Sequence, residues 1–191
     1  MPTAAQIANA LYGAWRLALF DAGGMSHFER TVNGFWRSFF AVAVVMPLFL
    51  LVSAAQMDLI PGIRSEVHYM AIRTLSFIIL WLAFPVVISG VVRSLGRDER
   101  YIDFIIAYNW SQAVQNLVYL PLLMMILAGL IPAAVAPLLT TAAIAWSLIY
   151  TWYVARVALN ISPLAAVGIV AIDFLLGTVI MAFSGHRLMG G

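Results

Sequence analysis

Cysteine and lysine are both absent from this sequence of 191 residues. Without cysteine, the chain cannot form disulfides, use a thiol as a nucleophile or bind a metal through sulfur. Without lysine, it cannot form a Schiff base or supply the lysine of a phosphate-binding P-loop. Charged residues of every kind are scarce, at 9% of the chain, whereas a soluble domain has about 25%. These absences exclude several classes of enzyme and argue against a soluble fold.

Long apolar stretches take the place of the missing charge. Hydrophobic residues make up 64% of the chain, and the mean hydropathy is +0.99. About 20 apolar residues in a helix cross a hydrocarbon core of about 30 Å, and a helix satisfies its own backbone polar groups in lipid. The sequence therefore predicts an all-α, polytopic membrane helix bundle with five transmembrane helices, at about 35–55, 72–92, 101–129, 133–155 and 163–183.

An interfacial amphipathic helix is expected ahead of these spans, at residues 3–20. One face would carry Gln6, Asn9, Gly13 and Arg16, and the other Ile7, Leu11, Ala14, Trp15 and Leu19. With a single charge, such a helix suits the membrane interface better than water. Residues 21–24, Asp-Ala-Gly-Gly, would end it. We therefore divide the chain into an interfacial helix and turn, 1–24, and a five-span membrane domain, 25–191.

Local signals indicate where the spans begin. Ser26 and Glu29 have the spacing of a capping box ahead of the first span, and Ser162 followed by Pro163 would open the fifth. Asp98 and Glu99 would cap the start of the third span. Pro61-Gly62 indicates a turn between the first two spans.

The arginines indicate the orientation of the chain, because basic residues are enriched in cytoplasmic loops. With the N-terminus in the cytoplasm, seven arginines lie inside and three outside: Arg16, Arg30, Arg37, Arg93, Arg97, Arg100 and Arg156 against Arg64, Arg73 and Arg187. We expect a multi-pass protein of a bacterial inner membrane, with a cytoplasmic N-terminus and a periplasmic C-terminus. The exclusive use of arginine fits a bacterial genome rich in G and C.

The third predicted span carries four carboxamides, which cannot all face lipid because each needs hydrogen-bond partners. Asn109, Gln112 and Asn116 share one helix face by their spacing, and Gln115 lies on an adjoining stripe. These side chains could line a path for a polar solute or protons. They could equally serve as hydrogen-bonding contacts between helices.

Asp173 is the only acid in the interior of a predicted span. A carboxylate at that depth costs about 2.5–3.5 kcal/mol on insertion scales, so Asp173 should face protein or water and be neutral or hydrogen-bonded. Gln115 and Asn116 would lie at a similar depth and are its expected partners. The candidate intramembrane site is therefore Asn109, Gln112, Gln115, Asn116 and Asp173, either a proton or solute site or a packing contact.

Catalytic, metal and cofactor sites are not indicated. His27, His68 and His186 are far apart and form no metal-binding pattern, and the sequence has neither a nucleophile elbow nor a glycine-rich phosphate loop. We predict that the protein is not an enzyme and has no cofactor. A net charge of +2 gives no reason to expect a nucleic acid partner.

A second feature favours packing between helices. Ala133, Pro137, Thr141 and Ala145 recur every four residues in the fourth span, which gives a face of small residues. Such a face allows close approach of another helix, so a protein partner or a second copy of the chain is expected alongside the lipid bilayer.

The order of an interfacial segment and five closely spaced spans resembles the layout of Yip-family membrane proteins. Residues 35–40, Phe-Trp-Arg-Ser-Phe-Phe, are the part nearest to a signature, and they also resemble uncharacterised five-span proteins of alphaproteobacteria. The resemblance covers the architecture and transfers no functional residue. It implies a structural or interaction protein of the membrane, and the alternative is a small transporter or channel centred on the polar cluster.

Overall fold

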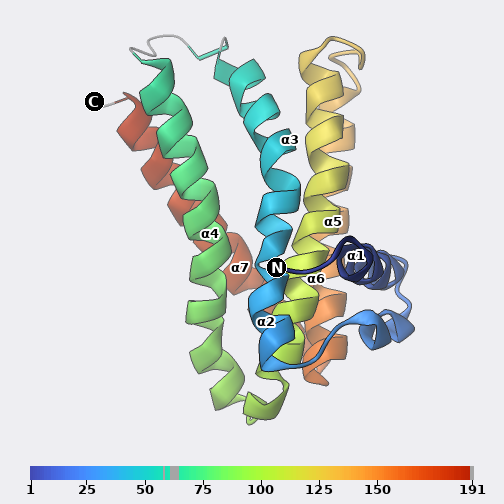
Figure 1. Cartoon of the computed structure of the whole chain (residues 1–191). Helices are drawn as coiled ribbons and strands as arrows, with labels where there is room; N and C mark the ends of the chain where they lie inside the picture. The colour runs from blue at the N-terminus through green and yellow to red at the C-terminus, as the bar shows by residue number, and fades with distance from the viewer. Residues whose placement is uncertain (58, 61–64, 190–191) are drawn as a thin grey trace.

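The computed structural model describes residues 1–57, 59–60 and 65–189, with side chains as far as residue 185, and that part of the chain is helical (Figure 1). The helices in order are α1 (Ala4–Ala18), the 3₁₀ helix η1 (Ala22–His27), α2 (Val32–Ser38), α3 (Phe40–Met57), α4 (Glu66–Ser94), the 3₁₀ helix η2 (Asp98–Arg100), α5 (Tyr101–Leu127), α6 (Ala136–Leu159) and α7 (Pro163–Met189). The predicted turn at Pro61-Gly62, Arg64 and the side chains of His186 and Arg187 lie outside the described residues.

Within the described residues, five helices are long and apolar enough to cross a membrane, which agrees with the predicted number. They are Val32–Met57, Glu66–Ser94, Asp98–Leu127, Ala136–Leu159 and Pro163–Gly185. The predicted spans differ from them at the ends. The first span is formed by α2 and α3 together, with a one-residue interruption at Phe39.

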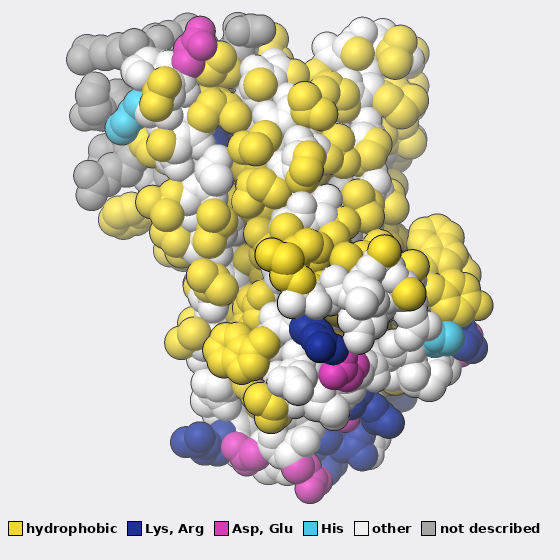
Figure 2. All heavy atoms as spheres, in the orientation of Figure 1, with side chains coloured by type: hydrophobic (Ala, Val, Ile, Leu, Met, Phe, Trp, Pro, Cys, Tyr) yellow, Lys and Arg dark blue, Asp and Glu magenta, His cyan; other side chains and the backbone are white. Residues whose placement is uncertain are grey.

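Helix α5 lies at the centre of the bundle. It packs along α3 on one side and α6 on the other, and α7 joins α6 to α4 (Figure 1). The connections from α4 to α5 and from α6 to α7 lie at one end of the bundle (Figure 1). Figure 2 shows the dark blue of arginine side chains gathered at this end. The segments there carry Arg30, Arg93, Arg97, Arg100 and Arg156. We call it the arginine-rich end, and the opposite end the far end.

Helix α1 lies across α5 and α6 at about mid-height of the bundle (Figure 1). Two tyrosines of α6 hold its backbone: the Tyr150 hydroxyl donates to the Ala14 carbonyl at 2.5 Å, and the Tyr153 hydroxyl donates to the Phe20 carbonyl at 2.6 Å. Gly13 permits close packing of η1 on α1, since a Cβ there would lie 2.7 Å from the His27 Cβ. The N-terminal segment is therefore part of the packed structure.

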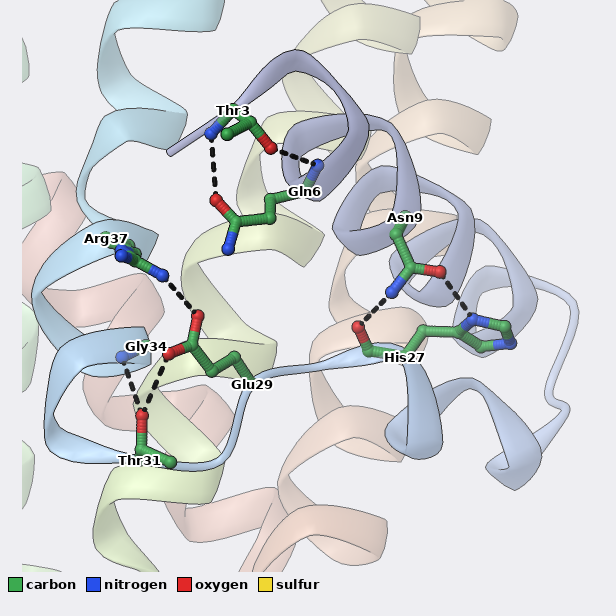
Figure 3. A network of polar contacts seen from close by, with 8 residues as sticks. All are labelled: Thr3, Gln6, Asn9, His27, Glu29, Thr31, Gly34 and Arg37. Carbon is green, nitrogen blue, oxygen red and sulfur yellow. Dashed lines mark hydrogen bonds and ion pairs between the residues drawn. The ribbon is translucent and has the colours of Figure 1, made fainter. Parts of the chain in front are cut away.

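Polar contacts join α1 to the segment that follows it (Figure 3). The Asn9 amide donates to the His27 carbonyl at 2.8 Å, and the His27 ring Nδ1 lies 2.9 Å from the Asn9 Oδ1. Arg16 forms an ion pair of 2.5 Å with Asp21 at the turn. The Arg16 hydrogen bond, together with that from the Gly23 N–H, lowers the pKa of Asp21 below its ordinary value.

The predicted capping box at Ser26 and Glu29 is wrong. Ser26 lies within η1 and donates to the Gly23 carbonyl at 2.8 Å. The true cap is Thr31, whose hydroxyl accepts from the Gly34 N–H at 3.1 Å. Glu29 instead accepts a bond of 2.8 Å from Arg37 (Figure 3). Arg37 offers this carboxylate a charged partner, which is stronger than a neutral backbone amide.

Of the caps predicted for the later spans, one is confirmed and one is wrong. Ser162 caps α7 as predicted, because its hydroxyl accepts from the Ala165 N–H at 3.2 Å and the helix begins at Pro163. Asp98 does not cap the third span. It accepts a hydrogen bond of 3.4 Å from Arg93, and η2 precedes α5 without a side-chain cap.

The faces of α1 differ from the expected division. Gly13 was placed on the polar face but is buried against protein together with Ala10, Ala14 and Leu17. Trp15 and Leu19, from the predicted apolar face, are exposed. The outward side of α1 is thus a stripe at helical spacing that contains Ala5, Ala8, Tyr12, Trp15 and Leu19.

Candidate functional site

A cavity of about 530 Å³ lies among α3, α4, α5, α6 and α7, and it reaches Asp173. We call it the central cavity. Four of the five predicted site residues line it: Gln112, Gln115, Asn116 and Asp173. A volume of this size is in the usual range for sites that bind small molecules, about 300–1,000 Å³.

Asp173 and Tyr108 meet at the deep end of the cavity. The Tyr108 hydroxyl donates to the Asp173 Oδ1 at 2.6 Å, which links α5 to α7. The Tyr108 ring is stacked on Phe84 of α4, with ring centroids 4.1 Å apart. The sequence pointed to Gln115 or Asn116 as partners of Asp173, and the structure gives Tyr108 instead. Tyr108 lies level with Asp173, whereas Gln115 and Asn116 lie about two helical turns further along α5.

The carboxamides form one wall of the cavity, and two of them are fixed. The Gln115 amide donates to the Thr151 hydroxyl at 3.2 Å and accepts from the Ser147 hydroxyl, which ties α5 to α6. The Asn116 amide donates to the Gln112 carbonyl at 2.8 Å. The Gln112 side chain lines the cavity beside the Tyr108 hydroxyl on its own helix, and it is not bonded to α6. It is therefore the carboxamide most able to bind a ligand.

Asn109 has a different role from the other predicted site residues. It is fully buried, and it does not line the cavity. Its Oδ1 accepts from the Trp81 indole N–H at 3.1 Å, and its amide donates to the Ser38 hydroxyl at 2.8 Å. These two bonds join α5 to α4 and to α2. Asn109 is thus a packing contact between three helices.

The cavity also contains Arg73, which the sequence did not single out as a site residue. Its Nη2 donates to the Gln56 Oε1 at 3.1 Å, and its Cζ lies 5.6 Å from the centre of the Phe49 ring. Sequence analysis treated Arg73 only as a topology signal because it lies near the start of a predicted span. The structure begins this helix at Glu66, earlier than the predicted span, and this places Arg73 two turns inside α4.

Arg73 and Asp173 lie at opposite ends of the cavity. A Cβ on Gly177 would lie 4.0 Å from the Leu80 Cδ1, so these two residues are at the same level. At a rise of about 1.5 Å per residue, Arg73 is about 10 Å from that level toward the far end, and Asp173 is about 6 Å from it toward the arginine-rich end. The two levels are therefore about 16 Å apart along the bundle.

Beyond Asp173, the bundle is filled with apolar and aromatic side chains. Ile88, Phe104 and Ile169 are fully buried there. The central cavity therefore belongs to the far-end half of the bundle, and a tightly packed layer separates it from the arginine-rich end.

The described residues contain no group of three or more His, Asp or Glu side chains placed to bind a metal ion. Comparisons with protein-family models, curated proteins and solved structures find no match to this chain. The resemblance to Yip-family proteins thus stays a prediction from the sequence. The chemistry of the cavity is the remaining basis for an inference about function.

The different roles of Asn109 and Gln112 predict that two similar substitutions on α5 change the free energy of unfolding by different amounts. Asn109→Leu should lower the free energy of unfolding by about 1–3 kcal/mol, because it leaves the Trp81 indole N–H buried without an acceptor. Gln112→Leu should change it by less than about 0.5 kcal/mol, as expected for a side chain outside the structural bonds. Denaturant unfolding of the purified protein in detergent measures both. Equal losses in the two variants would contradict the division.

Proposed function

We propose that the protein binds a small molecule with polar groups inside the membrane, and that the central cavity is the carrier or receptor site for it. The observation that carries this proposal is that the cavity reaches Asp173 and is lined by Gln112, Gln115 and Asn116. Polar side chains in a membrane bundle are expensive and face protein or water. Here they surround a space large enough for a ligand.

The cavity wall supports binding because part of it is held in place before a ligand arrives. Gln115 is fixed by two hydroxyls of α6, and Asp173 is fixed by Tyr108. Groups that are already ordered lose little conformational entropy on binding, which favours affinity. The Gln112 amide adds a donor and an acceptor that a ligand can use.

The proposal includes a location and an orientation. We place the protein in a bacterial inner membrane with the arginine-rich end in the cytoplasm, as the arginine bias favours. The exposed stripe of α1, with Tyr12, Trp15 and Leu19, would then face lipid in the cytoplasmic half of the bilayer. The cavity would open on the periplasmic half of the bilayer.

Cysteine labelling tests the cavity and the orientation together, and the chain offers a background free of native cysteine. Gln112→Cys should react with a charged, membrane-impermeant thiol reagent added from the periplasmic side. Arg97→Cys should react only from the cytoplasmic side. Ser111→Cys is the matched control, because the Ser111 side chain is buried next to Gln112 and should be protected.

Two labelling results would contradict the proposal. Protection of Gln112→Cys from both sides would mean that the cavity is not reached from water. Reaction of residues 97 and 112 from the same side would refute the orientation of the cavity relative to the arginine-rich end.

Substitutions of Asp173 test whether this carboxyl exchanges protons with the cavity. Asp173→Asn keeps an acceptor for Tyr108 and should leave stability within about 0.5 kcal/mol. Asp173→Leu removes the acceptor and should cost about 1–3 kcal/mol. If Asp173 exchanges protons with the cavity, its infrared carboxyl band should change with pH between about 4 and 9, as expected for the protonation of one carboxyl group. The band should be missing from Asp173→Asn. A band that is constant over this range would leave Asp173 as a packing contact.

A second candidate function is the structural or interaction role that the Yip-like layout implies. One observation favours it: the small residues Pro137, Thr141 and Ala145 are exposed on α6, and Ala133 is exposed in the turn that precedes this helix. In a monomer this face contacts lipid, and a second copy could approach it closely.

This interaction role predicts an effect of bulk at Ala145. Ala145→Leu should weaken self-association by about tenfold, because an overpacked contact costs about 1–3 kcal/mol. Ala142→Leu, at an exposed position about 100° around the helix from Thr141, is the control. Counting of photobleaching steps in lipid vesicles gives the oligomeric state. A wild-type protein that is monomeric at all densities would exclude self-association through this face.

A further inference from the structure

Arg73 places a permanent positive charge in the wall of the central cavity. A guanidinium has five N–H donors, and Arg73 uses one of its groups to bond Gln56. Its Nε is buried and has no hydrogen-bond partner in the part of the chain that the structure describes. A buried donor without an acceptor is rare in folded proteins and calls for an explanation. Arg73 also lines the cavity, so an oxyanion there would accept from guanidinium N–H donors that Gln56 does not use.

The side of the cavity formed by α5, α6 and α7 is open toward the lipid. Residues that line the cavity there are also exposed on the outer surface: Val118 on α5 by 41%, Ile144 on α6 by 42%, and Phe174 and Met181 on α7 by 54% and 65%. All four are apolar and lie within the membrane-spanning segments. The cavity is therefore continuous with the hydrocarbon layer as well as with its own polar wall.

The two features lie at depths that suit the two parts of an amphipathic molecule. Arg73 is about two turns from the far-end start of α4, where a long basic side chain reaches the headgroup level. Phe174 follows Asp173 directly and lies about 16 Å deeper along the bundle, at hydrocarbon depth. A head group at Arg73 could thus leave its chain in the lateral opening.

We propose that the ligand of the central cavity is an anionic amphiphile, with an oxyanion head on Arg73 and an apolar chain in the opening between α6 and α7. This inference rests on the proposed function, because it names the class of molecule that the same cavity binds. The Gln112 and Asn116 carboxamides then bind polar atoms of the ligand below its head.

The test uses the full-length protein in a neutral detergent, with dodecyl phosphate as the probe and native mass spectrometry as the readout. Wild type should bind one dodecyl phosphate per chain, and inorganic phosphate should bind at least tenfold more weakly. Arg73→Gln should weaken dodecyl phosphate binding by about tenfold or more, because it removes a charge-assisted contact. Arg93→Gln is the matched control, since Arg93 is an exposed arginine on the same helix at the arginine-rich end.

A second variant keeps the test decisive if Arg73→Gln does not fold. Met181→Trp fills the lateral opening from an exposed position and should weaken binding of dodecyl phosphate while leaving Arg73 in place. Unchanged binding in the folded variants, or inorganic phosphate binding as tightly as dodecyl phosphate, would overturn the proposal. If wild type binds no dodecyl phosphate but Gln112→Cys is labelled, the amphiphile is wrong and the cavity site stands. If Gln112→Cys is protected, the cavity site itself fails.

Discussion

Hydrogen-bonding partners for the polar side chains of α5 are the constraint on which this bundle depends, since lipid offers none. Asn109 obtains its partners from α2 and α4, Gln115 from α6, and Tyr108 from α7. One central helix is thereby tied to its neighbours on several sides. Each such bond is modest, on average about 0.6 kcal/mol in a membrane protein. Their main effect is to fix which face of α5 meets which helix.

The same helix explains why the cavity exists where it does. Toward the arginine-rich end, α5 packs through large buried side chains, such as Phe104, whose ring centroid lies 6.1 Å from that of Phe84 on α4. Toward the far end, its carboxamides need polar surroundings, and the neighbouring helices do not close on all of them. A polar wall that cannot be covered by apolar packing leaves a space that water or a ligand can fill.

Much of the fold was predictable from the sequence, because lipid imposes one simple rule on length and hydropathy. That rule predicted the five spans, and the cap at Ser162 followed from local chemistry. The spacing of Asn109, Gln112 and Asn116 predicted a shared polar face, and of these three Gln112 and Asn116 line the cavity. Other features depend on contacts between distant segments. The true cap at Thr31 exists because Arg37 engages Glu29, and Tyr108 could not be recognised as the partner of Asp173 without the packing of α7. Asn109 and Gln112 look alike in the sequence, and only the neighbouring helices separate their roles.

Helix α6 connects the central cavity to α1 through neighbouring turns. Its Ser147 faces the cavity, whereas Tyr150 and Tyr153 hold the backbone of α1 one and two turns further along. An α-helix is stiff over so short a distance, so a tilt of α6 that widened the cavity would move the backbone of α1 with it. The position of α1 on the outer surface is thus coupled to the width of the cavity on the other side of α6.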